Sequence, residues 1–391
     1  MLRAACMTSQ SNKSLLVVGG EASADMHAAR VIAALKENNP QLHIFGIGGE
    51  QMRAQGMEVV APAEDLATAG LTEVIFALPR IFGIMRRMEK KAKAHQPAAA
   101  LLLDLPDFNL RLAKRLKRLG IPVIYYISPQ LWAWRPKRVE TVRQLVDHML
   151  VILPFEEEFY TQHQVPVEFV GHPLCEILPE NPDTEVAKNQ LELDASAHPI
   201  VALLPGSRRK EVLRHLPRML DAMKLLSQDK PNMQILIPVA STIPKPLIEE
   251  LVEQSALKAN IIEGKATEVI NASDLAVVCS GTATLQTALL LKPMVVVYRV
   301  SWLSYQILRR LVRIANIGLV NLVAGKTLAT ELVQNAFSAT NLKQECLKLI
   351  EDVEHRNFVV QELSQLRSKL TKPNTAKRVG EIIQKYLPSK P

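Results

Sequence analysis

The sequence is poor in aromatic side chains, in cysteine and in long apolar runs. Aromatic residues make up 5% of the chain and are not interleaved with basic residues, which argues against a nucleic-acid partner. The 4 cysteines are scattered without paired spacing, which favours free thiols in a reducing compartment. No stretch offers the ~20 uncharged apolar residues that a membrane-spanning helix needs.

Motifs of several common enzyme classes are also missing. The turn GGEASAD, at residues 19–25, lacks the three-glycine spacing of a dinucleotide site, and no turn is a Walker loop. These absences argue against nicotinamide chemistry and ATP hydrolysis. No cluster of histidines and carboxylates has metal-ligand spacing, and there is no Asp-x-Asp element. We therefore expect neither a metal nor a cofactor.

The composition that is present describes a basic globular protein. The 391 residues are 48% hydrophobic and 22% charged, and a chain of this length is expected to form two domains. The net charge of +8 and the pI near 9.2 favour anionic partners. With nucleic acid disfavoured, phosphorylated metabolites and anionic lipid are the partners to consider.

Short apolar runs alternate with segments of helical periodicity, which predicts an α/β fold of two Rossmann-like domains whose parallel sheets face each other across a cleft. Predicted strands include residues 15–18, 42–49, 98–103, 123–127, 201–204, 234–238, 275–279 and 294–298. Residues 174–194 are rich in proline and acid and resemble a linker, and the chain from Ser301 onward looks helical. The predicted divisions are a first Rossmann-like domain at 1–178, a second at 179–365, and a helix at 366–391 that packs on the first domain or on a partner chain.

Two turns of the second predicted domain suit an anionic ligand. The strand IVALL ends in LPGSRRKE, which places Gly206, Ser207 and Arg208 beside a strand end, where α/β proteins bind ligands. The turn SGTA, Ser280 to Ala283, also lies between a strand and a helix, where backbone amides of Gly281 and Thr282 favour a diphosphate. The alternatives are a solvated basic loop and ordinary helix capping.

Two turns of the first predicted domain carry carboxylates. Gly20 and Ser23 belong to a small-residue turn after the first strand, where Ser23 or Asp25 is alternatively a helix cap. Asp104 ends another apolar strand, in the segment DLPDFN, and a carboxylate there suits a general base. Asp107 is then a cap or a ligand-binding group, and in the alternative interpretation both aspartates are caps.

The segment WAWRPKR, residues 132–138, sets two tryptophans beside cations. Trp134 could hold a sugar face, and Arg135 and Arg138 could hold a phosphate. Two core tryptophans with a solvated basic flank are an equally good interpretation.

Residues 71–93 combine a broad apolar stretch with a basic border, which is typical of a segment lying in a membrane interface. The alternative is a helix packed on the sheet with a basic outer rim. The side chains that would contact lipid are Ile75, Phe76, Leu78, Ile81 and Phe82, with Arg86 and Arg87 at the border.

Taken together, these segments resemble the lipid A disaccharide synthases, membrane-associated glycosyltransferases of Gram-negative bacteria. The resemblance covers nearly the whole chain and is carried by GGEASAD, LDLPDFN, YISPQLWAWRPKRV, LPFEEEFY, VEFVGHPL, LLPGSRRKEV, ASDLAVVCSGTATLQ and NLVAGK. It implies a B-type glycosyltransferase fold and an inverting, metal-independent transfer from UDP-2,3-diacylglucosamine to 2,3-diacylglucosamine 1-phosphate. The products would be the β-1,6-linked lipid A disaccharide 1-phosphate of lipopolysaccharide biosynthesis and UDP.

The resemblance also implies roles for individual residues and a place in the cell. Asp104 matches the candidate base, Glu21 a functionally important glutamate, and Arg208 and Asn321 residues of donor binding or catalysis. Asn109, in the segment LDLPDFN, is an expected acceptor contact. The resemblance implies acceptor and membrane binding by residues 1–178 and UDP-sugar binding by residues 179–365. The family's peripheral location on the cytoplasmic face of the inner membrane and its homodimer with exchanged C-terminal segments are further expectations.

Three positions depart from the family pattern and bear on donor geometry. Gln286 replaces a common glutamate suited to a ribose hydroxyl pair, Ala24 a glycine, and Val320 a proline. The alternative functions are another B-type UDP-sugar enzyme, such as the peptidoglycan N-acetylglucosaminyltransferase or a UDP-sugar 2-epimerase, or a non-catalytic lipid- or nucleotide-binding protein.

Overall fold

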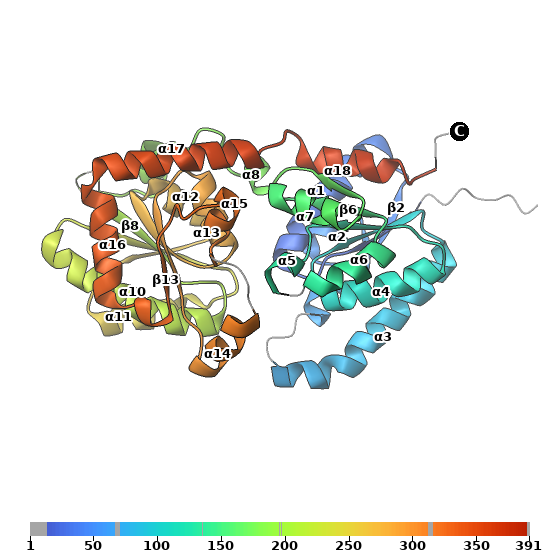
Figure 1. The fold of residues 1–391 in the computed structure, drawn as a ribbon, viewed down its shortest axis with the longest axis horizontal. Coiled ribbons are helices and arrows are strands. Elements are labelled where there is room, and N and C mark those ends of the chain that lie inside the picture. Colours follow the sequence, from blue (N-terminus) through green and yellow to red (C-terminus); the bar gives the residue numbers. More distant parts are fainter. Residues whose placement is uncertain are drawn as a thin grey trace, which may run out of the picture. The chain divides into compact units, whose positions relative to one another are not determined.

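The structure is a computed structural model that describes residues 14–66, 71–134, 136–194, 196, 198–311 and 316–388. The chain divides into two compact units, Met1–Pro173 with Lys372–Pro391, and Leu174–Thr371. Each unit is a parallel β-sheet with helices packed on it (Figure 1). The predicted boundary at 178/179 falls after the first helix of the second unit, whereas the units divide before that helix.

The first unit contains a 7-stranded sheet in the order β3-β2-β1-β4-β5-β6-β7, and all its pairings are parallel. Strands β1 and β4 are buried throughout, as expected for parallel strands covered on both faces. The strands are β1 (Ser14–Val18), β2 (His43–Gly48), β3 (Glu58–Pro62), β4 (Ala99–Leu103), β5 (Val123–Tyr126), β6 (His148–Val151) and β7 (Val167–Phe169).

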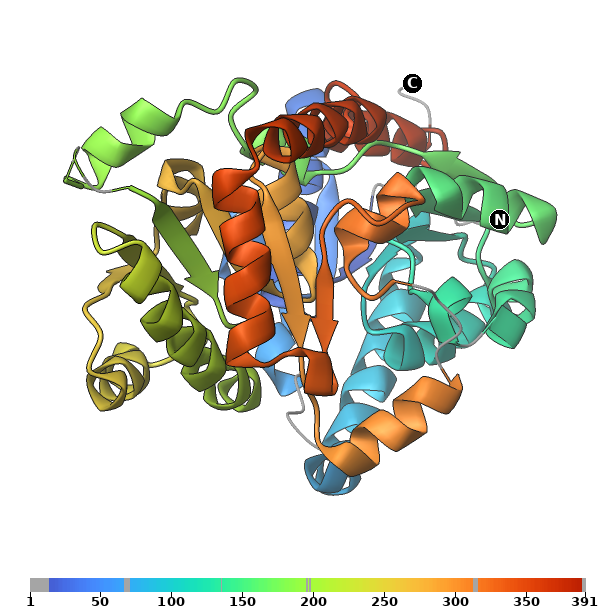
Figure 2. The same ribbon diagram turned by 60° about the vertical axis from the view of Figure 1, so that its left-hand side comes forward.

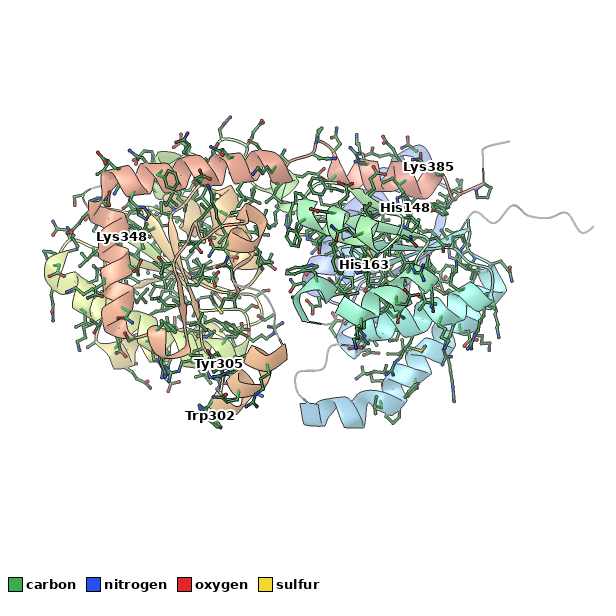
Figure 3. The ribbon with its side chains drawn as sticks, in the orientation of Figure 1. His148, His163, Trp302, Tyr305, Lys348 and Lys385 are labelled. Carbon is green, nitrogen blue, oxygen red and sulfur yellow. The ribbon has the colours of Figure 1, made fainter. Side chains whose placement is uncertain are left out.

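Helices of the first unit fill the connections between these strands, and the C-terminal helix α18 packs against α1. The C-terminal segment also contacts the edge of the sheet. Arg378 of α18 donates to Glu168 of β7 at 2.9 Å. His148 of β6, which Figure 3 labels near Lys385 just after α18, lies beside the ring of Tyr386. The helices are α1 (Ala22–Asn38), α2 (Glu50–Ala54), η1 (Ala63–Asp65), α3 (Leu71–His95), α4 (Pro106–Arg118), α5 (Leu131–Trp134), η2 (Pro136–Arg138), α6 (Val139–Leu145), α7 (Pro154–Gln162) and α18 (Thr375–Gln384).

The second unit contains a 6-stranded parallel sheet in the order β10-β9-β8-β11-β12-β13. Strands β8 and β11 are neighbours and are buried along their whole length. The strands are β8 (Ile200–Leu204), β9 (Gln234–Val239), β10 (Asn260–Glu263), β11 (Leu275–Cys279), β12 (Met294–Tyr298) and β13 (Glu331–Val333).

Helix α16 crosses one face of this sheet and packs against α10 (Figure 2). The amphipathic α10 buries Val212, Leu216, Met219 and Met223 in the core of this unit. The helices are α8 (Leu174–Ile177), α9 (Thr184–Gln190), α10 (Arg209–Asp229), α11 (Lys245–Ser255), α12 (Ala266–Ala272), α13 (Thr282–Leu289), α14 (Trp302–Leu311), α15 (Leu319–Ala324), η3 (Gln334–Ala336), α16 (Ala339–Glu351) and α17 (Val353–Leu370).

Two predictions about the second half of the chain are wrong. The segment 174–194, interpreted as a linker, contains α8 and α9, and α9 packs against α12 through contacts that include a 2.8 Å bond from Asn271 to the carbonyl of Asp183. The chain after Ser301 is not only helical, because Glu331–Val333 forms the edge strand β13. That strand is too short to leave a periodic signal in the sequence.

Candidate functional site

Asp104 lies immediately after β4, in a backbone turn that other residues hold in place. Asp104 and Leu105 have φ values of 52° and 39°, in the left-handed region that residues with side chains rarely adopt. Asn109 Nδ2 donates to the carbonyls of Leu103 at 2.8 Å and Asp104 at 2.6 Å, and the Tyr125 hydroxyl donates to the Asp104 carbonyl at 2.5 Å. These three bonds fix the backbone that carries the Asp104 carboxylate.

The Asp104 carboxylate is electrostatically unusual. Burial, followed by the negative charge of Glu21, raises its pKa from 3.8 to about 6. Its buried Oδ2 has no hydrogen-bond partner in the described part of the chain. Neither Asp104 nor Asp107 caps α4, whose N-cap is Leu105, so the interpretation of both as caps is wrong. A desolvated carboxylate with a raised pKa is suited to accept a proton near neutral pH.

The turn after β1 lies next to Asp104, because β1 and β4 are paired neighbours. A Cβ added to Gly20 would lie 1.9 Å from Leu105 Cδ1, so a larger residue at this position would displace the Leu105 side chain. Glu21 and Ser23 are exposed beside it. Neither Ser23 nor Asp25 caps α1: Asp25 instead accepts from the backbone amides of Gly49, Gln51 and Met52 at the start of α2.

The WAWRPKR segment follows β5, the next strand along the sheet. Arg138 forms an ion pair with Asp107, which joins this segment to the first turn of α4. Trp132 donates to Glu156 at 3.1 Å, and burial raises the pKa of the Glu156 carboxyl to about 7. Trp132 is therefore held inside the unit, in agreement with the core interpretation for that tryptophan. Arg135 and the side chain of Trp134 lie outside the described residues.

In the second unit, the turn after β8 is organised by Glu211. Its Oε2 accepts from the backbone amides of Ser207 and Arg208 at 3.2 Å, and its Oε1 pairs with Arg208 Nη1 at 3.0 Å. Gly206 has a φ of 118° and lies against this carboxylate, so a side chain there would be strained and would clash with Glu211. The Arg208 side chain is 76% exposed. The turn thus presents a cation to solvent from a fixed backbone.

His215 fastens the same turn to the end of β12. Its Nδ1 lies 3.0 Å from the carbonyl of Pro205, and the Arg299 amide donates to its Nε2 at 3.0 Å. Burial lowers the pKa of His215, which favours the neutral ring with its proton on Nδ1. His215 was not among the predicted site residues, because nothing in its local sequence marks it.

The SGTA turn follows β11, next to β8. The Ser280 hydroxyl donates to the carbonyl of Ile317 at 2.8 Å, so it does not cap α13, whose N-cap is Gly281. Thr282 and Ala283 begin α13. Gln286, one turn further on, donates to Thr267 Oγ1 at 3.1 Å. The two turns after β8 and β11 are therefore adjacent at one edge of the second sheet.

Asn321 is fully buried, and its side chain is used inside the unit. Its Nδ2 donates to the Ala329 carbonyl and to Glu331 Oε1, both at 2.8 Å, and its Oδ1 accepts from the amides of Leu328 and Ala329. Glu331 also accepts from the amides of Ile317 and Gly318 at 2.8 and 2.9 Å. Asn321 and Glu331 therefore position the segment whose Ile317 carbonyl accepts the hydrogen bond from the Ser280 hydroxyl. Glu331 had no recognisable sequence signal.

The predicted lipid-facing segment forms part of α3. Its second half packs on the sheet through Ile84, Met85 and Met88, as in the alternative interpretation. Leu78 and Phe82, by contrast, are 36% and 42% exposed. Ile81 is half-buried, and Arg86 and Arg87 are exposed. The side chains of Ile75 and Phe76 lie outside the described residues.

Neither a metal-binding cluster nor a membrane-spanning helix is found in the described part of the chain. No group of three or more histidine, cysteine or carboxylate side chains there is arranged to hold a metal ion. None of the helices in that part combines the length and the apolar character needed to traverse a bilayer.

The family model for lipid-A-disaccharide synthetase matches residues 15–385. The chain belongs to this family. A lipid-A-disaccharide synthase of Anaeromyxobacter dehalogenans strain 2CP-1 is 45% identical over 94% of this chain and 96% of its own, and one of Myxococcus xanthus is 44% identical over 96% and 97%. Membership of the lipid-A-disaccharide synthetase family makes this chain a glycosyltransferase of lipid A biosynthesis, as the sequence predicts.

Solved structures share the fold at much lower identity. The S. aureus MnaA–UDP co-structure has a TM-score of 0.65 at 12% identity and covers 96% of both chains. A glycosyltransferase of kitacinnamycin has a TM-score of 0.65 at 15% identity and covers 96% of this chain and 99% of its own. The B-type glycosyltransferase fold predicted from the sequence, with its two parallel sheets, is thereby confirmed.

Proposed function

We propose that this lipid-A-disaccharide synthetase family member transfers a 2,3-diacylglucosamine unit from UDP to 2,3-diacylglucosamine 1-phosphate. The products are the β-1,6-linked disaccharide 1-phosphate and UDP. The observation that carries the proposal is the buried Asp104 carboxylate, with a pKa raised to about 6, at a strand end in a family of glycosyltransferases. The acceptor 6-hydroxyl is a weak nucleophile that needs such a base within hydrogen-bond reach.

In the proposed reaction, Asp104 removes the proton as the acceptor oxygen attacks the anomeric carbon from the face opposite UDP. The new C–O bond forms as the bond to the UDP oxygen breaks, which inverts the configuration. Glu21 contributes by keeping the Asp104 carboxylate basic. Ser23, Asp107 and Arg138 are the proposed acceptor contacts, since Arg138 is tied to Asp107 beside the base; Trp134 and Arg135 belong to the same proposed group.

The second unit is proposed to bind UDP. The exposed guanidinium of Arg208 and the amides at the start of α13 are suited to stabilise the negative charge that develops on the leaving diphosphate. Gln286 is the proposed ribose contact and would have to exchange its bond to Thr267 for one to the nucleoside. Asn321 is proposed to position the neighbouring backbone and not to contact UDP, because its side-chain amide already bonds to Ala329 and Leu328.

The first half of α3 is the proposed membrane contact, on the cytoplasmic face of the inner membrane. Leu78 and Phe82 are exposed apolar side chains on a helix whose next turn carries exposed Arg86 and Arg87. Apolar groups bordered by cations bind anionic lipid surfaces. Acyl chains of both substrates would then remain in the bilayer while the sugars react. The homodimer implied by the family resemblance stays a prediction. Within the chain, α18 packs on α1.

The proposal is tested by incubating the purified full chain with both acylated substrates in detergent and following products by mass spectrometry. We expect equimolar disaccharide 1-phosphate and UDP. Asp104→Asn should lose turnover and keep UDP affinity, whereas Asp229→Asn, on an exposed ion pair with Lys343, should match the wild type. Turnover of UDP-N-acetylglucosamine, without disaccharide formation from the acylated pair, would instead identify another UDP-sugar enzyme.

A further inference from the structure

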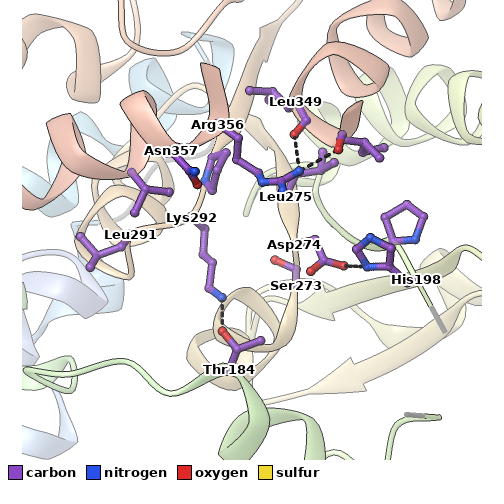
Figure 4. A pocket seen from close by; sticks show the side chains of 14 residues that line it. Thr184, His198, Ser273, Asp274, Leu275, Leu291, Lys292, Leu349, Arg356 and Asn357 are labelled. Carbon is purple, nitrogen blue, oxygen red and sulfur yellow. Dashed lines mark hydrogen bonds and ion pairs between the residues drawn. The ribbon is translucent and has the colours of Figure 1, made fainter. Parts of the chain in front are cut away.

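A cavity of about 220 Å³ opens at the amino ends of three neighbouring strands of the second unit (Figure 4). Strands β8, β11 and β12 begin directly after the lining residues Pro199, Asp274 and Pro293, and the end of α16 and the start of α17 cover it. The proposed donor turns follow the carboxyl ends of β8 and β11. The cavity therefore lies on the opposite edge of the sheet, about 16 Å away by the rise of a five-residue strand.

Lys292 places a buried positive charge in this cavity. The residue is 9% exposed, and its Nζ donates to Thr184 Oγ1 at 2.6 Å (Figure 4). Within the described residues, no ion pair joins it to an acidic side chain. Burial lowers the pKa of Lys292 to about 8, so the ammonium is still charged at pH 7. Buried charges in proteins are normally paired. The carboxylates of Asp274 and Glu185 attract the Lys292 ammonium, but neither forms an ion pair with it.

A second cation lines the same cavity in a fixed orientation. Arg356 Nη1 donates to the carbonyl of Ile350 at 2.7 Å and to that of Leu349 at 3.3 Å, which leaves Nε and Nη2 outside these bonds. A guanidinium fixed in this way presents its remaining donors to an oxyanion with little further loss of entropy.

Asp274, the acidic residue of the lining, supplies one negative charge against the two positive charges of Lys292 and Arg356. Oδ2 of Asp274 accepts from the Ile200 amide at 2.7 Å and lies 3.1 Å from His198 Nδ1. The charges of Lys292, Arg356 and Asp274 therefore leave the cavity with a net positive charge. That charge favours a small anion over a cation or a neutral sugar.

We propose that this cavity binds a small phosphate-class oxyanion at the Arg356 guanidinium, with the buried Lys292 ammonium adding to the positive charge of the site. Its volume is below the ~300 Å³ at which ordinary metabolite pockets begin, which excludes the nucleotide and the acylated substrates. Apolar side chains of Leu275, Leu291 and Val360 share the lining, so the ligand is inorganic phosphate or a phosphate ester with a small organic part.

The proposal is tested by isothermal titration calorimetry of the full chain with inorganic phosphate, and in a second arm with glycerol phosphate, at constant ionic strength. Saturating UDP is present in one series, so that phosphate bound at the proposed donor turns is displaced and phosphate in the cavity is not. We expect saturable binding that survives UDP. Tighter binding of the ester would identify an organic phosphate as the ligand, and equal or weaker binding would identify free phosphate.

Two variants locate the site. Arg356→Gln removes the guanidinium and should weaken phosphate binding by about tenfold or more, the equivalent of one charge-assisted hydrogen bond. Lys292→Met keeps the length of the side chain and removes its charge, so it should weaken binding by a smaller factor. Lys343→Met, which removes an ion-paired lysine of α16, should bind as the wild type does. Binding that is unchanged in the folded variants, or no saturation below about 10 mM, would overturn the proposal. UDP affinity is recorded in the same titrations, so failure of this site is distinguishable from failure of the proposed function.

Discussion

Asn109 donates to the backbone carbonyl of Asp104 at 2.6 Å, while the buried Oδ2 of Asp104 has no hydrogen-bond partner in the described part of the chain. The backbone of Asp104 is thus fixed and its carboxylate is left desolvated. Hydrogen bonds to a carboxylate lower its pKa and make it a weaker base. Because Asn109 bonds to the backbone of Asp104 and not to its carboxylate, it positions the carboxylate without making it a weaker base.

Asn109→Ala should therefore lower kcat by more than it changes the KM of either substrate. The carbonyls of Leu103 and Asp104 each lose a buried donor, which should also cost about 1–3 kcal/mol of stability. Steady-state kinetics and urea unfolding measure the two effects. Arg111→Gln, at an exposed position of the same helix, serves as the control and should change neither. An Asn109→Ala enzyme with wild-type kcat would show that this support is unnecessary.

Asp104 should make the folded protein less stable as the pH rises. Its folded pKa of about 6 lies above the ordinary value of 3.8, so its contribution is fully favourable below about pH 3.8 and is lost as the pH rises through 6. Relative to wild type, Asp104→Asn should gain stability between pH 4 and pH 7, by about 2–3 kcal/mol. Chemical denaturation at several pH values measures this difference. A difference that is independent of pH would mean that the carboxylate is not perturbed in the folded state.

Glu331→Ala should weaken both the second unit and its binding of UDP. The variant leaves the amides of Ile317 and Gly318 without their acceptor, at a cost of about 1–3 kcal/mol for a buried group. The displaced segment carries the Ile317 carbonyl, which accepts the hydrogen bond from the Ser280 hydroxyl. Because Ser280 belongs to the proposed UDP-binding turn, UDP affinity should fall as well. Thermal unfolding and UDP titration test this prediction, with the exposed Glu354→Ala as the control. Unchanged UDP affinity in Glu331→Ala would separate this network from the donor site.

Acid should destabilise the first unit through two buried histidines. Burial lowers the pKa of His27 to about 4 and that of His172 to about 3. The unfolded chain binds protons at about pH 6.5 and the folded chain does not, so stability is full above pH 6.5 and falls as the pH decreases toward 4. His27→Gln should flatten this loss in unfolding experiments between pH 7 and 4.5. A His27→Gln variant that loses stability with acid as steeply as the wild type would contradict this role of His27.

Leu78→Ser combined with Phe82→Ser should move the protein from membranes to the supernatant. The change removes exposed apolar groups from the proposed contact, so the free energy of unfolding should change little while vesicle binding falls. Sedimentation with vesicles containing anionic lipid measures the partition. The control is Val353→Ser with Phe358→Ser, two apolar residues of α17 that are more exposed than Leu78 and Phe82. Equal loss in both double variants would argue against a specific contact through α3.

Much of the framework follows from local sequence. Asp104 was identifiable because AALLL is too apolar for an exposed strand and is followed directly by an acid, and the β8 and β11 turns carry the same kind of signal. The partners of these residues were not identifiable. Tyr125 reaches Asp104 from the neighbouring strand β5, and Glu331 reaches Ile317 from the edge strand β13. Such long-range bonds leave no periodic pattern in the sequence.

Asn321 shows the limit of assigning roles from motif resemblance. The resemblance assigned it to donor binding or catalysis, yet its amide makes four hydrogen bonds within its own segment. Buried polar groups must be satisfied, and only the tertiary structure shows whether a ligand or the protein does so. The same holds for Glu211, whose carboxylate occupies amides that a phosphate could otherwise use.

The most direct test is the pH dependence of kcat/KM for disaccharide formation, which reports groups of the free enzyme, in wild type and Asp104→Asn. The wild type should lose activity on the acid side with an apparent pKa near 6, as the Asp104 carboxylate takes up a proton. Asp104→Asn should be slower by about a hundredfold or more and should lack this acid limb. An Asp104→Asn enzyme that keeps wild-type turnover and the same acid limb would contradict the assignment of Asp104 as the base.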